Sequence, residues 1–76
     1  MNKDRRQLLN DANDTLDEVI SQLNDIKDEE EEAFDSLPEN FQESERANRM
    51  TAAIEAIEKA ISSIEDAQKS IDKAAK

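Results

Sequence analysis

Two long stretches of the chain place apolar residues at alternating spacings of three and four positions. In the first stretch the positions are Leu9, Ala12, Leu16, Val19, Leu23, Ile26, Ala33 and Leu37, and Glu30 interrupts the series. In the second they are Ala47, Met50, Ile54, Ile57, Ile61, Ile64, Ile71 and Ala75, and Gln68 interrupts it. This spacing gives each α-helix one narrow apolar face, as in a coiled-coil seam. The pattern therefore predicts two helices that both need a partner.

Pro38 separates the two stretches, because proline lacks a backbone donor and disfavours helical geometry at the residue before it. We expect helix one over about residues 3–35, a turn over about 36–38 and helix two over about 38–74. The matched lengths and the short connection predict an all-α fold, a single antiparallel hairpin domain over residues 1–76.

The two seams agree in a register centred on the segment from Leu37 to Asn40. The expected facing pairs are Leu23 with Ile54, Val19 with Ile57, Leu16 with Ile61 and Ala12 with Ile64. The predicted seam accordingly includes Leu16, Val19, Leu23, Ile26, Ile54, Ile57, Ile61 and Ile64.

Two polar interactions are expected around the turn. Ser36 and Glu39 have the spacing of a capping box, so Ser36 is expected to cap helix two. Glu30, the acidic residue at a seam position, is expected to be neutralised by Arg46 and Arg49 across the hairpin.

Several apolar positions stay outside the predicted seam. They include Leu8, Ile20 and a stripe of small residues that immediately precede the seam positions of helix two: Ala53, Ala56, Ala60, Ser63, Ala67, Ser70 and Ala74. A single hairpin buries too little apolar surface to offset the entropy of ordering the chain. We therefore expect a homodimer that completes a four-helix bundle or coiled coil.

The composition removes most catalytic chemistry. The chain has no Gly, Cys, His, Trp or Tyr. Without Gly there is no phosphate-cradling loop, and without His and Cys there is no thiol nucleophile, imidazole base, disulfide or common zinc, haem or iron–sulfur site. We expect no enzymatic activity and no cofactor. The polar start and the lack of a long apolar run predict no signal peptide and no membrane association, hence a cytoplasmic location.

Charge is the second strong feature. Ten bases face twenty acids for a net charge of -10, and residues 10–45 hold fourteen of the acids with one base. The candidate partner-binding residues are Asp28, Glu29, Glu31, Glu32, Asp35, Glu39, Glu43 and Glu45. Such a cluster is either a solubilising surface or a negative patch that steers towards a basic protein surface in the manner of nucleic-acid phosphates. Direct binding of DNA or RNA is disfavoured by the net charge.

Carboxylates are also the one group that suggests metal chemistry. Glu29, Glu32 and Asp35 share a helical face, with Glu55 and Glu58 as possible additional ligands. This spacing resembles the acidic clusters of all-α nucleotide pyrophosphohydrolases, but no base-binding pocket accompanies it. We therefore assign no metal site.

The segment from Asp28 to Arg46 resembles small acidic helical uncharacterised proteins of bacteriophages and prophages. The likeness covers about residues 16–72, and its most particular parts are Leu37-Pro38-Glu39 and Ser44-Glu45-Arg46. The resemblance implies a protein that acts in the host cytoplasm by binding a basic, nucleic-acid-handling host enzyme and blocking it, as anti-CRISPR and other anti-defence inhibitors do. The alternative is a self-associating structural or assembly protein whose carboxylates only keep it in solution.

Overall fold

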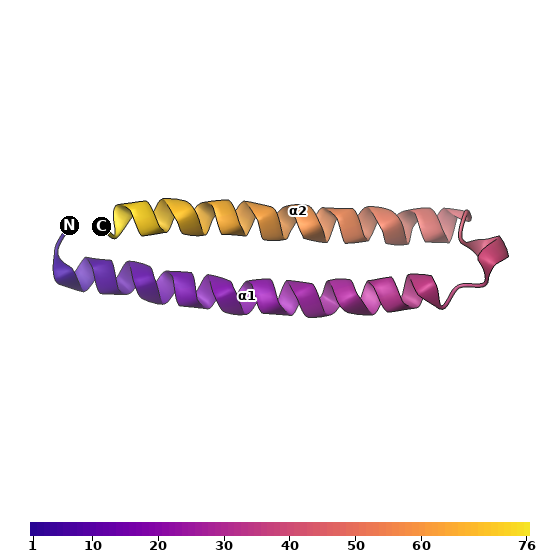
Figure 1. Ribbon diagram of the computed structural model, residues 1–76, viewed down its shortest axis with the longest axis horizontal. Helices are drawn as coiled ribbons and strands as arrows, with labels where there is room; N and C mark the ends of the chain where they lie inside the picture. Colours follow the sequence, from indigo (N-terminus) through magenta and orange to yellow (C-terminus); the bar gives the residue numbers. More distant parts are fainter.

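The computed structural model describes residues 1–76 and is an antiparallel hairpin of two long helices, the expected all-α architecture (Figure 1). Helix α1 spans Lys3–Asp35 and helix α2 spans Glu45–Ala74, with a short 3-10 helix, η1, at Glu39–Phe41 between them. The rod measures 59 × 15 × 11 Å, and the two termini lie together at one end.

The helix ends are fixed by short polar side chains. The Asn2 side chain accepts a hydrogen bond from the Arg5 amide at 2.8 Å, and Ser44 Oγ accepts one from the Ala47 amide at 3.2 Å. Both are N-caps, which satisfy backbone donors that the first helical turn leaves unpaired. Ser36 instead ends α1, where its hydroxyl donates to the Glu32 carbonyl at 2.8 Å. The expected capping of helix two by Ser36 is therefore wrong.

The connection is longer than predicted, and helix two begins at Glu45 rather than near residue 38. Pro38 has ψ 148° and starts only the single turn of η1, in which the Phe41 amide donates to the Pro38 carbonyl at 2.8 Å. Proline has no side-chain acceptor with which to cap a helix, whereas Ser44 does. The first strong cap after the proline therefore sets the start of α2.

The longer connection also moves the register. Asn13 Nδ2 donates to the Gln68 carbonyl at 3.3 Å, and Gln68 Nε2 donates to the Asn13 carbonyl at 3.2 Å. The predicted register places Ile64, not Gln68, opposite Asn13, so the expected facing pairs are wrong by about one helical turn. The turn centre shifts because residues 36–44 now separate the helices.

The seam of α2 is occupied as predicted, with Ile54, Ile57, Ile61 and Ile64 half-buried. Ala47 and Met50, on the same seam, are the two buried residues of the chain.

The seam of α1 is partly different. Leu16, Val19 and Leu23 are half-buried as expected, but Ile26 is 51% exposed and Lys27 is half-buried in its place. The same shift by one residue occurs at two other positions. Ile20, which follows Val19, is half-buried, and Phe34 is half-buried whereas Ala33 before it is exposed. Turning α1 in this way brings the larger side chains of Ile20 and Phe34 towards α2. The prediction that Ile26 belongs to the seam between the helices is therefore wrong.

The expected neutralisation of Glu30 is also absent. The one ion pair of the hairpin joins Arg49 to Glu45 at 2.9 Å within α2, and both side chains are exposed. The observed register moves Glu30 along α2, from Ala47 towards Met50. Its carboxylate consequently lies half-buried without a cationic partner. Neither helix contains an apolar segment long enough to cross a bilayer.

Candidate protein-binding surface

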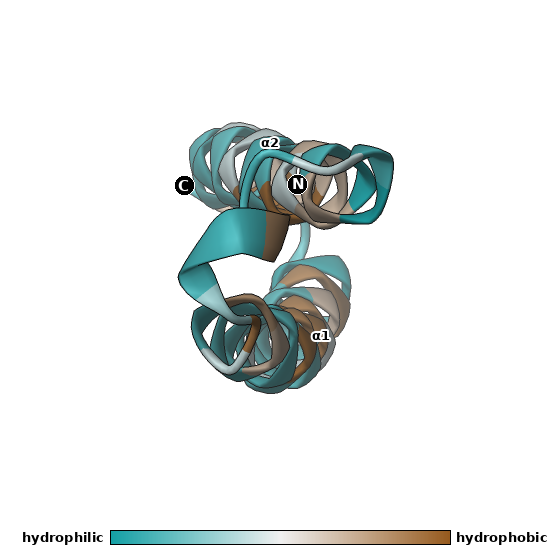
Figure 2. Cartoon of the chain, turned by 90° about the vertical axis from the view of Figure 1, so that its right-hand side faces the viewer, coloured by the Kyte–Doolittle hydropathy of each residue, from teal (hydrophilic) through white to brown (hydrophobic).

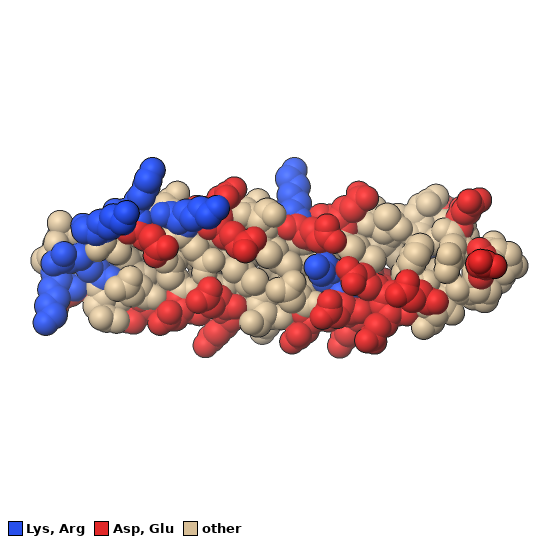
Figure 3. Space-filling view, viewed as in Figure 1, with Lys and Arg blue, Asp and Glu red and all other residues tan.

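The acidic residues gather at the end of the rod that carries the connection. Residues 20–60, which form this half, contain twelve acids and four bases, whereas the half with the termini contains eight acids and six bases. Figure 3 shows the separation: carboxylates cover much of the right half, and Lys and Arg gather at the left end. The negative charge of the hairpin is therefore concentrated in the half that carries the connection.

Almost none of the candidate carboxylates is neutralised. Of the eight predicted partner-binding residues, Glu31 is half-buried and the other seven are exposed. Only Glu45 takes part in an ion pair, with exposed Arg49. Exposed pairs of this kind stabilise a protein by about 1 kcal/mol at most, so they hold these side chains in place only weakly. The carboxylates are thus available to a cationic partner.

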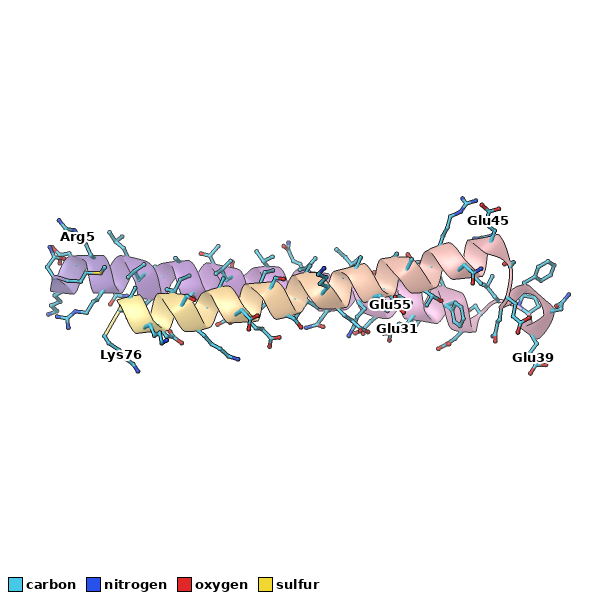
Figure 4. The ribbon with its side chains drawn as sticks, turned by 90° about the horizontal axis from the view of Figure 1, so that it is seen from above. Arg5, Glu31, Glu39, Glu45, Glu55 and Lys76 are labelled. Atoms are coloured by element: carbon cyan, nitrogen blue, oxygen red, sulfur yellow. The ribbon has the colours of Figure 1, made fainter.

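The candidate carboxylates do not form one patch. Asp28, Glu31 and Asp35 recur at steps of three and four on α1 and so share one side of that helix. In Figure 4, Glu31 and Glu39 lie on one side of the rod, and Glu45 lies on the other. Glu55 of α2 lies on the same side as Glu31. The helical spacing alone did not reveal that Glu55 adds to this acidic side, because that depends on how the helices pair.

Polar side chains join the helices on the side that carries Glu31, because Asp17 lies fourteen residues, about four helical turns, before Glu31 on α1. Asn13 Nδ2 donates to Asp72 Oδ1 at 2.8 Å, and Gln68 Nε2 donates to Asp17 Oδ1 at 2.7 Å. We call this side, with Asp17, Glu31 and Asp72, the polar flank. On this flank the helices are joined by hydrogen bonds between side chains.

An apolar hollow of about 440 Å³ opens at the connection, within the acidic end. Its lining residues are Leu37, Pro38, Phe41, Ser44 and Arg46. Phe41 is 52% exposed, an unusual state for a large aromatic side chain in so polar a protein. The end of the rod thus combines negative charge with an uncovered apolar surface, which the sequence pattern did not indicate because η1 creates it.

The structure does not assemble a metal site from the candidate ligands. No group of three acidic residues approaches closely enough to hold an ion. Glu29 and Glu32 are exposed on α1, whereas Glu55 and Glu58 belong to the other helix. Hard cations take six or more oxygen ligands at about 2.0–2.6 Å, which these separated carboxylates do not supply.

Comparisons with protein-family models, with curated proteins and with solved structures find no match.

Proposed function

We propose that this hairpin is a non-catalytic binding module whose acidic end docks on a positively charged protein surface. The observation that carries the proposal is the set of exposed carboxylates at one end of the rod, of which only Glu45 has a cationic partner. Concentrated charge of one sign raises the association rate with an oppositely charged partner and selects against partners of the same charge.

The density of charge supports a partner that normally binds nucleic acid. Six carboxylates fall within the eight residues from Asp28 to Asp35. At 1.5 Å per residue they occupy about 12 Å of helix axis, or one charge per about 2 Å. Duplex DNA carries one charge per about 1.7 Å of its axis. A basic groove that accepts DNA can therefore accept this helix end with similar charge compensation.

The hollow at the connection supplies the apolar contacts of such an interface. Exposed Phe41 and the lining of Leu37 and Pro38 offer apolar contact where the carboxylates offer charge. Aromatic side chains that fill or line pockets dominate the affinity of many interfaces. By occupying the groove, the hairpin excludes nucleic acid from it, which makes it an inhibitor of the enzyme that it binds.

The test compares two variants with the same change in net charge. Replacing Glu29, Glu31, Glu32 and Asp35 with their amides removes four charges at the acidic end. The control replaces Asp14, Glu18, Glu65 and Asp66 in the other half of the rod, all of which are exposed. Each chain is immobilised, basic proteins of the host are captured and purified, and the dissociation constant is measured over a range of salt.

We expect the first variant to bind at least about tenfold more weakly, a loss of about 1.4 kcal/mol, with a smaller salt dependence. The control variant should bind like the native chain, and duplex DNA should compete with the hairpin. Equal affinities for all three chains would remove the electrostatic mechanism.

A second function, self-association, is favoured by a separate observation. Leu8 is 65% exposed and Ile26 is 51% exposed, and both lie on α1 outside the connection. Large apolar side chains left in water on a helix face are typical of a protein that packs against another chain.

A further inference from the structure

The hairpin has an uncovered apolar side opposite its polar flank. On α1 this side carries Leu8, Ala12, Val19, Ile26 and Ala33, and on α2 it carries Ala53, Ala56, Ala60, Ala67 and Ala74. Leu8, Ile26 and most of the alanines are exposed, and the others are half-buried. We call this side the apolar flank. From it we infer that a second copy of the chain packs on the flank in antiparallel orientation, so that the connection of each copy lies beside the termini of the other.

The two halves of the apolar flank lie on one side of the rod for a geometric reason. Each of its residues immediately precedes a seam position, as Val19 precedes Ile20 on α1 and Ala56 precedes Ile57 on α2. One residue is a rotation of about 100° around a helix axis, so both stripes are turned from the seam by about a quarter turn in the same sense. Because the helices run antiparallel, equal rotations bring the stripes to the same side. In Figure 2 the brown segments of α1 accordingly extend from the seam along its right-hand side.

The flank has the size and the shape of a dimer interface. One whole side of the rod, including its polar positions and the connection, is 59 Å long and 15 Å wide and spans roughly 900 Å², and the apolar flank forms the part of it along both helices. Stable complexes bury about 800 Å² on each partner. The small side chains of α2 allow helix axes to approach to about 8 Å, the short limit of helix packing. Leu8, Val19 and Ile26 supply the larger apolar groups.

Charge selects the antiparallel orientation. The end with the termini carries Lys3, Arg5, Arg6, Lys69, Lys73 and Lys76. A parallel pair would place two acidic ends side by side. An antiparallel pair places Arg5 at the level of Ala33 of the second copy and so near Glu29, the carboxylate of the segment from Asp28 to Asp35 that lies on the apolar flank. The backbone dipoles do not distinguish the two arrangements, since every neighbouring helix is antiparallel in both. The side-chain charges therefore decide.

The spacing of the flank residues fits a two-fold axis near the middle of the rod. With Val19 on the axis and facing Val19 of the second copy, Ala12 faces Ile26, a small side chain against a large one. On α2 the same axis passes near Ser63 and places Ala60 against Ala67. The register given by Asn13 and Gln68 puts Val19 and Ser63 at nearly the same level of the rod, so a single axis serves both helices.

This dimer does not depend on the proposed binding of a basic partner. In the antiparallel arrangement, Lys3 lies at the level of Asp35 of the second copy, so residues 36–44 extend past its termini. The hollow at the connection and the polar flank stay accessible at both ends. Failure of the dimer would leave these surfaces, and so the proposed function, intact. Because the amide variant of Glu29, Glu31, Glu32 and Asp35 also removes charge that favours the antiparallel dimer, its mass in sedimentation equilibrium distinguishes loss of the dimer from loss of partner binding.

The lack of cysteine makes the orientation directly testable. Val19→Cys should oxidise to a covalent dimer, because a residue on the two-fold axis meets itself. Ala12→Cys and Ile26→Cys should not form dimers alone, but a mixture of the two should form a mixed disulfide. Cross-linking of Val19→Cys with Ser63→Cys in a mixture, without self-linking of Val19→Cys, would show parallel packing and overturn the inference.

Sedimentation equilibrium on the native chain provides the second measurement. We expect twice the monomer mass of 8.6 kDa. Ala67→Glu, on the apolar flank, should shift the equilibrium to the monomer, and Ser62→Glu, an exposed position off that flank, should not. A native chain that stays at the monomer mass at all concentrations, or a dimer in which none of these cysteines cross-links, would overturn the inference.

Discussion

Asn13 and Gln68 set the register of the hairpin, since the side-chain amide of each donates to the backbone carbonyl of the other at 3.3 Å and 3.2 Å. No other residue pair of the two helices is joined by such a reciprocal bond. A polar residue at a seam position costs stability but penalises every register in which it lacks its partner. The pair thus fixes the position of α1 along α2 near the termini, and we call it the register pair.

The register set by Asn13 and Gln68 can be tested with pairs of cysteine substitutions. Asn13→Cys combined with Gln68→Cys should form an intramolecular disulfide on mild oxidation, because these positions face each other. Asn13→Cys combined with Ile64→Cys should not, since it requires a shift of about 5.4 Å along the helix. The reverse result, read from peptide masses after proteolysis, would support the register expected from the sequence.

Replacing Asn13 and Gln68 by apolar residues separates their effect on stability from their effect on the register. Asn13 Oδ1 is buried without a hydrogen-bond partner, so the polar pair is incompletely satisfied. Asn13→Leu with Gln68→Leu should raise the free energy of unfolding. Gln68→Leu alone should lower it by about 1 kcal/mol, because the Asn13 carbonyl and Asp17 Oδ1 lose the donor Gln68 Nε2 while polar Asn13 stays at the seam. Urea denaturation measures both values. Greater stability of the single variant than of the double variant would contradict the role of the pair.

The caps give a contrast between two serines that flank the connection. Ser44→Ala should destabilise the hairpin by about 1 kcal/mol, because the Ala47 amide loses its acceptor. Ser36→Ala should cost less, since the Glu32 carbonyl also accepts from the Ser36 amide at 3.0 Å. Thermal unfolding followed by circular dichroism compares the two. A larger loss for Ser36→Ala would restore the capping box predicted at that position.

Glu30 tests the orientation of α1. It is half-buried at the seam without a cationic partner, whereas Glu29 is exposed. Glu30→Leu should therefore stabilise the hairpin by about 1 kcal/mol, since it adds apolar contact and removes a carboxylate from the seam. Glu32→Leu, at an exposed position of α1 on the side away from the seam, is the matched control and should have little effect on the free energy of unfolding. Equal effects would mean that the two positions are equivalent.

The crowded carboxylates predict that salt stabilises the fold. Residues 10–45 contain one base, Lys27, among fourteen acids, so repulsion opposes the folded state. Raising the ionic strength from about 0.01 M to about 1 M shortens the Debye length from about 30 Å to about 3 Å and should raise Tm. The amide variant of Glu29, Glu31, Glu32 and Asp35 should show a smaller rise. A fall in Tm with salt would indicate that attractive pairs dominate instead.

The sequence alone determined that the chain forms two helices, because apolar residues recur at helical spacing on both sides of Pro38 and proline interrupts a helix. In α2 the isoleucines fit a single helical phase. Ile54, Ile57, Ile61 and Ile64 are the half-buried residues that this spacing predicts. The acidic end was equally evident, since a charge keeps its position in the chain whatever the fold.

Only the tertiary structure decided the face that α1 turns to its partner. Leu9, Leu16 and Leu23 fit two helical phases, one that continues through Ile26 and one that continues through Lys27. Periodicity cannot choose between phases that differ by one residue, because the choice depends on what the opposite helix offers. The pairing of Asn13 with Gln68 and the length of the connection settle it, and Ile26 is left on the surface of the hairpin.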